Sequence, residues 1–156
     1  MKNLGSIKSW VTSFDKAATD VDDLDVLYEL LSDPKVMQYL EAPYTKEKTE
    51  QFLINAGLSD PPLVFAADSG DTMIGYVIFH DYDDESIEIG WVLKPSCWGK
   101  GYASRLTELL IEKGRGLRKK LVIECDPAQE ITKHLAVKYG FAYEGRIDGL
   151  DVFRSE

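Results

Sequence analysis

The feature that most constrains this fold is a glycine-rich loop, residues 98–103, between a predicted strand and a predicted helix. Residues 87–93 have the composition of a half-buried strand, and residues 103–113 carry apolar side chains at helical spacing. Gly99 and Gly101 let backbone N–H groups approach a ligand closely at the positive end of the helix. The loop therefore predicts a cradle for a diphosphate group.

The elements around this loop predict a sheet with one parallel pair of strands. A strand over residues 121–125 follows the helix, so strands 87–93 and 121–125 should be parallel neighbours. Turn signals favour antiparallel hairpins elsewhere, and the remaining strands are predicted at residues 7–14, 63–67, 73–80, 141–145 and 150–154. The prediction is an α+β (α/β) fold in a single domain, residues 1–156, with a central mixed, mostly antiparallel sheet and helices on both faces.

The helices are predicted from apolar spacing and from their end signals. Gly114 and Gly116 are suited to end the helix after the loop in a left-handed conformation. Pro127 is expected to open a later helix that Gly140 closes and that carries Ile131, Leu135 and Tyr139 on its apolar stripe. Earlier helices are predicted over residues 21–31, 36–40 and 46–56.

Composition excludes several classes of protein. Cys97, Cys125, His80 and His134 are the only cysteines and histidines, and none has metal-ligand or disulfide spacing, so no metal site is predicted. A formal charge of −9 disfavours a nucleic-acid partner. No apolar run approaches the roughly 20 residues of a membrane span, and the first residues do not resemble a secretory leader. A cytoplasmic protein with no membrane partner is therefore expected.

A dinucleotide-binding domain is the first alternative for the glycine-rich loop. Gly99 and Gly101 precede a helix, and Glu124 lies in the following strand, where a ribose-binding carboxylate would be expected. Ser104, however, occupies the position of the third glycine, and 156 residues leave no room for a second nucleotide-binding half. This alternative is therefore remote.

The loop and the strand before it resemble the acetyl-CoA-binding motif of GNAT N-acetyltransferases. The resemblance rests on residues 87–93, Pro95 and residues 98–103. Trp98 stands where many GNAT enzymes have Gln or Arg, and this choice is similar to the RimJ/RimL-like branch. Residues 23–37 and 138–141 resemble the same branch, so the similarity covers nearly the whole chain.

The resemblance implies where acetyl-CoA binds. In GNAT enzymes the strand equivalent to residues 87–93 splays from the next parallel strand, and the pantetheine arm lies between them. Gln129 stands where the branch usually has Asn, which helps to hold that arm. The residues implied to bind the cofactor are Trp91, Val92, Leu93, Trp98, Gly99, Lys100, Gly101, Tyr102, Ala103, Ser104 and Gln129.

The resemblance also implies direct attack of an amine on the thioester in a ternary complex. Since an ammonium ion cannot attack, a base must remove a proton, and Glu88 stands at the position of the base carboxylate in many GNAT enzymes. Strand alternation could instead turn Glu88 to solvent. Thr132 matches a position commonly occupied by Ser, whose hydroxyl bonds the cofactor sulfur. Ala136 replaces the tyrosine acid of many relatives, and Tyr139 is an alternative acid that is expected to be core.

The acceptor amine is left open by these residues. A small-molecule amine such as a polyamine or an aminoglycoside and a protein N-terminus are both compatible, and the acidic charge, which solubility also explains, leans toward cationic acceptors. A CoA-binding module without catalysis is an alternative of a different class. Residues 150–153 are a candidate sheet edge for a homodimer.

Overall fold

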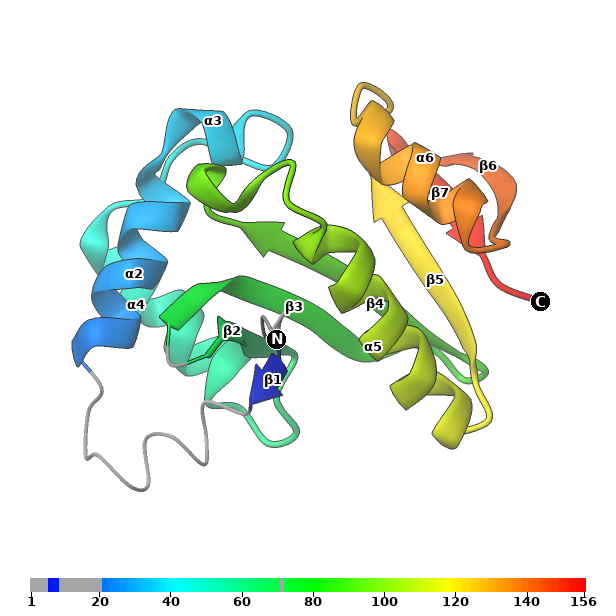
Figure 1. Cartoon of the computed structure of the whole chain (residues 1–156), viewed down its shortest axis with the longest axis horizontal. Coiled ribbons are helices and arrows are strands. Elements are labelled where there is room, and N and C mark those ends of the chain that lie inside the picture. The colour runs from blue at the N-terminus through cyan, green and yellow to red at the C-terminus, as the bar shows by residue number, and fades with distance from the viewer. Residues whose placement is uncertain (1–5, 9–20, 71) are drawn as a thin grey trace.

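The computed structural model describes residues 6–8, 21–70 and 72–156 (Figure 1). Their strands are β1 (Ser6–Lys8), β2 (Val64–Ser69), β3 (Thr72–Asp83), β4 (Ser86–Leu93), β5 (Lys120–Cys125), β6 (Ala142–Ile147) and β7 (Leu150–Arg154). Within this part of the chain they form one seven-stranded sheet in the order β1-β2-β3-β4-β5-β7-β6. All neighbours are antiparallel except β4 and β5, so the predicted mixed, mostly antiparallel sheet is confirmed.

The parallel pair is joined only at its beginning. Ser86, Ile87 and Glu88 of β4 pair with residues 120–122 of β5, and the ladder stops there although both strands continue. Figure 1 shows the two strands diverging toward their carboxyl ends. The sheet is therefore open between β4 and β5 at the end where the glycine-rich loop begins.

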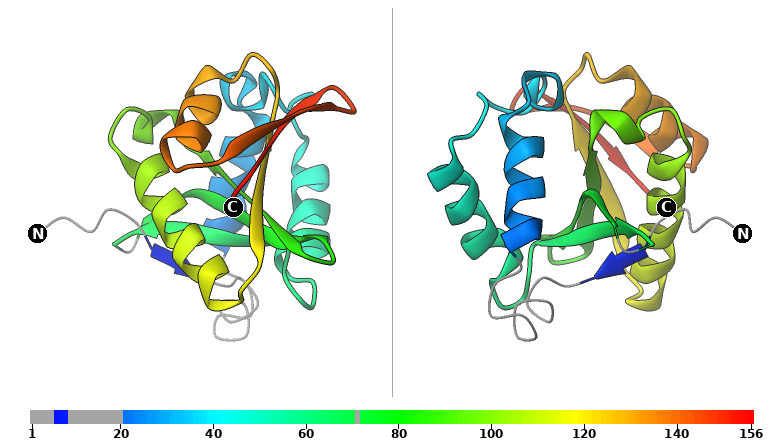
Figure 2. Two further views of the ribbon diagram at one scale, coloured as in Figure 1. Left: turned by 90° about the vertical axis from the view of Figure 1, so that its right-hand side faces the viewer. Right: turned by 60° about the vertical axis from the view of Figure 1, so that its left-hand side comes forward.

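Helices cover both faces of the sheet, as predicted (Figures 1 and 2). One face carries α2 (Val21–Ser32), α3 (Pro34–Met37), α4 (Lys46–Phe52) and a π-helical turn, η1 (Leu53–Gly57). The other face carries α5 (Tyr102–Gly116) and α6 (Glu130–Lys138). No helix of the described residues is long and apolar enough to cross a bilayer.

Alternate residues of β4 divide between two cores. Ile87 and Ile89 pack with Leu106 of α5, whereas Val92 packs with the leucines of α2. Because side chains alternate along a strand, Glu88 lies on the α2 face together with Val92. This alternation decides which face of the sheet each candidate site residue can serve.

Gly114 does not end α5, contrary to the prediction. It is buried inside the helix, and a Cβ there would lie 2.4 Å from Leu121 Cδ2, so the absent side chain lets α5 approach β5. The helix ends at Gly116, the other predicted end, but the left-handed residue is not this glycine; it is Arg118 beyond it, at φ 57°. The glycine thus serves close packing rather than termination.

The start of α6 and the burial of Ile131 were predicted wrongly. The helix begins at Glu130, because the residues around Pro127 form a turn in which Ala128 N donates to the Asp126 carboxylate at 2.9 Å. Ile131 is 77% exposed, whereas Leu135 of the same predicted stripe is buried, together with Ala136. The predicted end is confirmed, since Gly140 follows the helix at φ 87°.

Other boundaries differ by a few residues. α3 ends at Met37 rather than residue 40, and the predicted helix 46–56 is divided between α4 and η1. The predicted strand 7–14 overlaps β1 only at its start, and residues 9–14 lie outside the described part of the chain. The predicted edge at residues 150–153 is wrong, because the final hairpin places β7 between β5 and β6.

Candidate active site

A cavity of about 760 Å³ lies at the open end of the β4–β5 pair. It is lined by the end of β4, the loop before α5, the first turn of α6 and residues 35–40. The predicted site residues among its lining are Trp91, Val92, Leu93, Trp98, Gly99, Gly101, Tyr102, Ala103, Ser104, Gln129 and Thr132. Lys100, which is exposed, and Glu88 are not part of the lining.

The loop ends in a helix N-terminus that has no side-chain cap. Gly101 is the N-cap residue of α5 at φ 86°, and no side chain bonds the N–H groups of the first turn. Gly99 is also left-handed, at φ 73°, and open space surrounds both glycines. First-turn N–H groups have no partner within a helix, and the helix dipole favours an anion beside them. The arrangement fits a diphosphate group.

A hydrogen bond from the Trp98 side chain links the loop to the end of β4. Its indole Nε1 donates a hydrogen bond to Leu93 O at 3.0 Å, while about half of the side chain is exposed. At the opposite side of the loop, the Tyr102 hydroxyl lies 3.1 Å from Ser69 Oγ at the end of β2. These two contacts hold the glycine pair between β4 and α5.

For the acetyl-CoA that the sequence resemblance implies as substrate, we expect Trp98→Phe to raise the KM about fivefold with little change in kcat, because one hydrogen bond worth about 1 kcal/mol no longer holds the loop. Phenylalanine keeps an aromatic ring at the cavity but is smaller than the indole and lacks its N–H donor. Steady-state kinetics with acetyl-CoA as the varied substrate measure the effect. An unchanged KM would show that the loop keeps its shape without this bond.

Gln129 and Thr132 come from the β5–α6 turn and the first turn of α6. Gln129 Oε1 accepts a hydrogen bond from Asp126 N at 2.8 Å, which leaves the Nε2 donors of the amide for a ligand. Thr132 is half-buried and lies one helical turn before the buried Ala136. Both face the cavity from the side opposite the glycine-rich loop.

Glu88 is half-buried on the α2 face of β4, so the fully solvent-facing alternative does not hold. Its cross-strand neighbour is His80, whose Nε2 lies 3.6 Å from Glu88 Oε1. Burial raises the pKa of the Glu88 carboxyl, a protonated His80 opposes this, and the charge of Glu124 adds to it. Glu88 lies about 13 Å along the strand from Val92, at about 3.3 Å per residue.

Sequence reasoning missed His80 and Glu124 as neighbours of Glu88. The sequence places His80 at the end of the predicted strand 73–80, and only the register of β3 against β4 places it opposite Glu88. His80 Nδ1 lies 3.0 Å from Asp81 O, which favours the tautomer that leaves Nε2 facing the carboxylate. No local pattern in the sequence signals this pairing.

Tyr139 is occupied away from the cavity. Its hydroxyl donates to Glu108 Oε2 at 2.8 Å and ties α6 to α5. Burial and this bond to a carboxylate raise the pKa of the Tyr139 hydroxyl, so it is a poor proton donor at neutral pH. The expectation that this side chain serves packing agrees with its contacts with the α5 core.

The wall formed by residues 35–40 was not anticipated as part of the site. Lys35, Val36, Gln38, Tyr39 and Leu40 line the cavity from the α2 face. Tyr39 is 37% and Leu40 46% exposed, so two adjacent large side chains present apolar surface on this wall. Among the described residues no cluster of three or more potential metal ligands is found.

Comparisons with known proteins decide the family. A model of the acetyltransferase (GNAT) domain family matches residues 17–142. The chain belongs to the GNAT acetyltransferase family. This membership, rather than a dinucleotide-binding fold, accounts for the glycine-rich loop. It also makes the protein an acyltransferase by family.

Individual relatives and solved structures are consistent with this family. The chain is 31% identical over 129 residues to the uncharacterized N-acetyltransferase YnaD of Bacillus subtilis (strain 168), covering 79% of this chain and 75% of that protein. It shares the fold of RimL, a ribosomal L7/L12 alpha-N-protein acetyltransferase in complex with coenzyme A, at TM-score 0.75 and 18% identity, covering 96% of this chain and 92% of that one. The spermidine N-acetyltransferase from Vibrio cholerae, in complex with CoA and spermine, gives TM-score 0.74 and 20% identity with 97% and 93% covered. The predicted GNAT fold and its likeness to RimL-type enzymes are confirmed.

Proposed function

We propose that the protein transfers the acetyl group of acetyl-CoA to a primary amine, of a small molecule or of a protein N-terminus, by direct attack in a ternary complex. The observation that carries this proposal is the uncapped N-terminus of α5 opening onto a cavity at the point where β4 and β5 part. RimL and the spermidine acetyltransferase, which share the fold, both contain CoA.

The binding roles follow from the lining of the cavity. The N–H groups of residues 101–104 bind the diphosphate, with Lys100 adding a positive charge nearby. Gln129 donates its amide N–H to the pantetheine arm, which lies between the diverging ends of β4 and β5. Acetyl-CoA supplies a thioester that an amine can attack.

The chemical roles divide between the two faces of the sheet. The amine nitrogen attacks the thioester carbonyl carbon, and the backbone N–H near Val92 stabilises the oxygen that becomes negative. The C–S bond then breaks, and the Thr132 hydroxyl bonds the departing sulfur. Glu88 accepts the proton of the amine through water and passes it toward His80 or solvent.

The acceptor is a primary amine of unspecified class. The relatives named for spermidine and for a ribosomal protein both modify amines, one a small polycation and the other a protein. Residues 35–40 contain Lys35 and no carboxylate. The net charge of −9 is therefore not concentrated on this wall, and the preference for cationic acceptors stays a prediction.

Release of CoA thiol from acetyl-CoA across a panel of amines tests the function. The panel should contain spermidine, an aminoglycoside, and peptides with a free or a blocked N-terminus. We expect thiol release with at least one amine and a product heavier by one acetyl group in mass spectrometry. Tight CoA binding with no thiol release for any amine would instead support a CoA-binding module without catalysis.

A further inference from the structure

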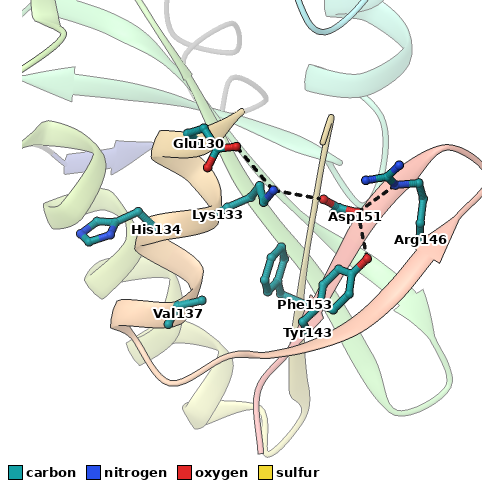
Figure 3. Close-up of a pocket in the computed structure, with 8 residues that line it drawn as sticks. All are labelled: Glu130, Lys133, His134, Val137, Tyr143, Arg146, Asp151 and Phe153. Atoms are coloured by element: carbon teal, nitrogen blue, oxygen red, sulfur yellow. Dashed lines mark hydrogen bonds and ion pairs between the residues drawn. The ribbon is translucent and has the colours of Figure 1, made fainter. Parts of the chain in front are cut away.

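The carboxylate of Asp151 is buried in a second hollow of about 530 Å³, which lies between α6 and the β6–β7 hairpin (Figure 3). The Asp151 side chain on β7 is 3% exposed. Arg146 Nε and the Tyr143 hydroxyl both donate to its Oδ1 at 3.1 Å, and Lys133 Nζ lies 3.6 Å from its Oδ2. Burial alone would raise the pKa of the Asp151 carboxyl, but these donors and the two cations hold it below its usual range.

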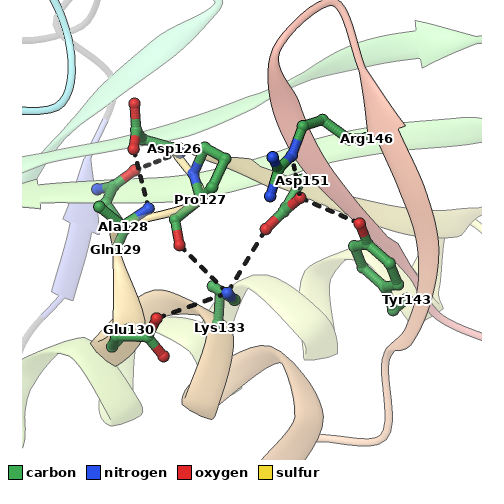
Figure 4. Close-up of polar contacts among 9 residues, drawn as sticks. All are labelled: Asp126, Pro127, Ala128, Gln129, Glu130, Lys133, Tyr143, Arg146 and Asp151. Atoms are coloured by element: carbon green, nitrogen blue, oxygen red, sulfur yellow. Dashed lines mark hydrogen bonds and ion pairs between the residues drawn. The ribbon is translucent and has the colours of Figure 1, made fainter.

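Lys133 connects this carboxylate to a different part of the chain. Its Nζ also donates to Pro127 O at 3.2 Å, so one ammonium group joins the final hairpin to the β5–α6 turn (Figure 4). Arg146 contacts the same carboxylate but comes from β6 within the hairpin itself. The contact of Lys133 with the exposed Glu130, at 3.6 Å, adds little because water screens it.

The turn that Lys133 holds is the one that presents Gln129. Gln129 N donates to Asp126 O at 2.9 Å, and Gln129 Oε1 accepts from Asp126 N at 2.8 Å. Pro127 lies inside this loop of bonds, so fixing its carbonyl fixes the orientation of the Gln129 amide. One position before Lys133 on the helix, Thr132 faces the cavity while Lys133 faces the hollow.

We propose that Lys133 and Asp151 are positioning residues that hold the β5–α6 turn so that Gln129 and Thr132 meet the pantetheine arm. The inference rests on the proposed function. A buried ion pair is weak as a source of stability, since apolar side chains of similar size would pack the hairpin as well. The Lys133–Asp151 pair instead fixes one geometry, because the Lys133 ammonium must contact the Asp151 carboxylate and the Pro127 carbonyl at the same time.

The test compares two substitutions on the same carboxylate. Lys133→Met removes the donor to Pro127 O and leaves Asp151 with Arg146 and Tyr143. Arg146→Met removes the other cation and leaves the turn contact intact. Calorimetry measures the Kd of CoA and that of adenosine 3′-phosphate 5′-diphosphate, the CoA fragment that lacks the pantetheine arm.

We expect Lys133→Met to raise the Kd of CoA about tenfold and to leave the Kd of the fragment within about twofold, because the fragment meets only the glycine-rich loop. Arg146→Met should leave both constants within about twofold. An equal loss for both ligands in Lys133→Met, no loss for CoA, or the same CoA-specific loss in Arg146→Met would each overturn the proposal.

A second pair of variants tests whether a loss of CoA affinity comes from a folding defect. Asp151→Asn should show the same CoA-specific loss, and Asp148→Asn, an exposed aspartate in the turn of the same hairpin, should show none. Melting temperatures of all four variants are recorded beside the binding data. A wild-type protein that binds neither ligand would refute the proposed function itself. If the ratio of the two Kd values in Lys133→Met and in Asp151→Asn equals that of the wild type, only the positioning role of Lys133 and Asp151 is refuted.

Discussion

Replacing Glu88 by glutamine is expected to lower kcat about 100-fold, in line with the usual contribution of a general base, and to leave the KM for acetyl-CoA nearly unchanged. Glutamine keeps the shape of the side chain beside His80 but cannot accept the proton. The KM should hold because Glu88 does not line the cavity that contains the proposed cofactor residues. Steady-state kinetics with the best amine of the panel measure both constants.

The pH dependence of kcat is a second test of Glu88 as the base. Burial and Glu124 raise the pKa of Glu88 above its usual value of 4.5, so kcat should fall as the pH drops through that raised pKa. The same shift means that folding favours the protonated carboxyl, and this contribution to stability is lost as the pH rises through the raised pKa. Glu88→Gln should therefore melt at a higher temperature than the wild type at neutral pH, and the difference should vanish at low pH.

Glu124→Gln is the matched control. It removes a neighbouring negative charge from the α2 face of β5, so the pKa of Glu88 should fall and the acid limb of the profile should move to lower pH. The plateau of kcat should stay as in the wild type. Unchanged turnover in Glu88→Gln would remove Glu88 from the mechanism, and an unshifted profile in Glu124→Gln would assign the acid limb to another group.

The parts of the fold that local sequence could predict are those with local causes. The β4–loop–α5 segment has its strand pattern, its two left-handed glycines and its helical spacing within one stretch, and the structure places them as expected. Gly114 was misinterpreted because a glycine near a helix end has two physical uses. Only the position of Leu121 on β5 shows that Gly114 serves close packing and not helix termination.

The parts of the site that the sequence did not reveal depend on contacts between distant segments. His80 opposes Glu88 through the β3–β4 register, and Lys133 reaches Asp151 only because β7 inserts beside β5. Residues 35–40 join the cavity because α3 ends beside it, a fact with no local signal. Ile131 shares the spacing of the buried Leu135, but it lies in the first turn of α6, where its side chain lines the cavity instead of the core.

Replacing Gly101 by valine is expected to raise the Kd of CoA about 100-fold, because losing two charge-assisted hydrogen bonds of about 1.5 kcal/mol each costs roughly two powers of ten. A β-branched residue does not adopt φ 86°, so the loop must change shape and withdraw the N–H groups at the start of α5. Unlike Lys133→Met, this substitution should weaken CoA and its nucleotide fragment equally, since both carry the diphosphate.

Gly140→Val supplies the control for Gly101→Val. Gly140 has nearly the same φ, 87°, has equally open surroundings, and lies at the far end of α6 from the cavity. Both variants should lose similar stability in thermal melts, about 1–2 kcal/mol, because each puts a β-branched residue where the native backbone is left-handed. Only Gly101→Val should lose CoA affinity. If Gly101→Val binds CoA as the wild type does, the N-terminus of α5 is not the diphosphate site, and if Gly140→Val loses affinity equally, the effect reports general unfolding.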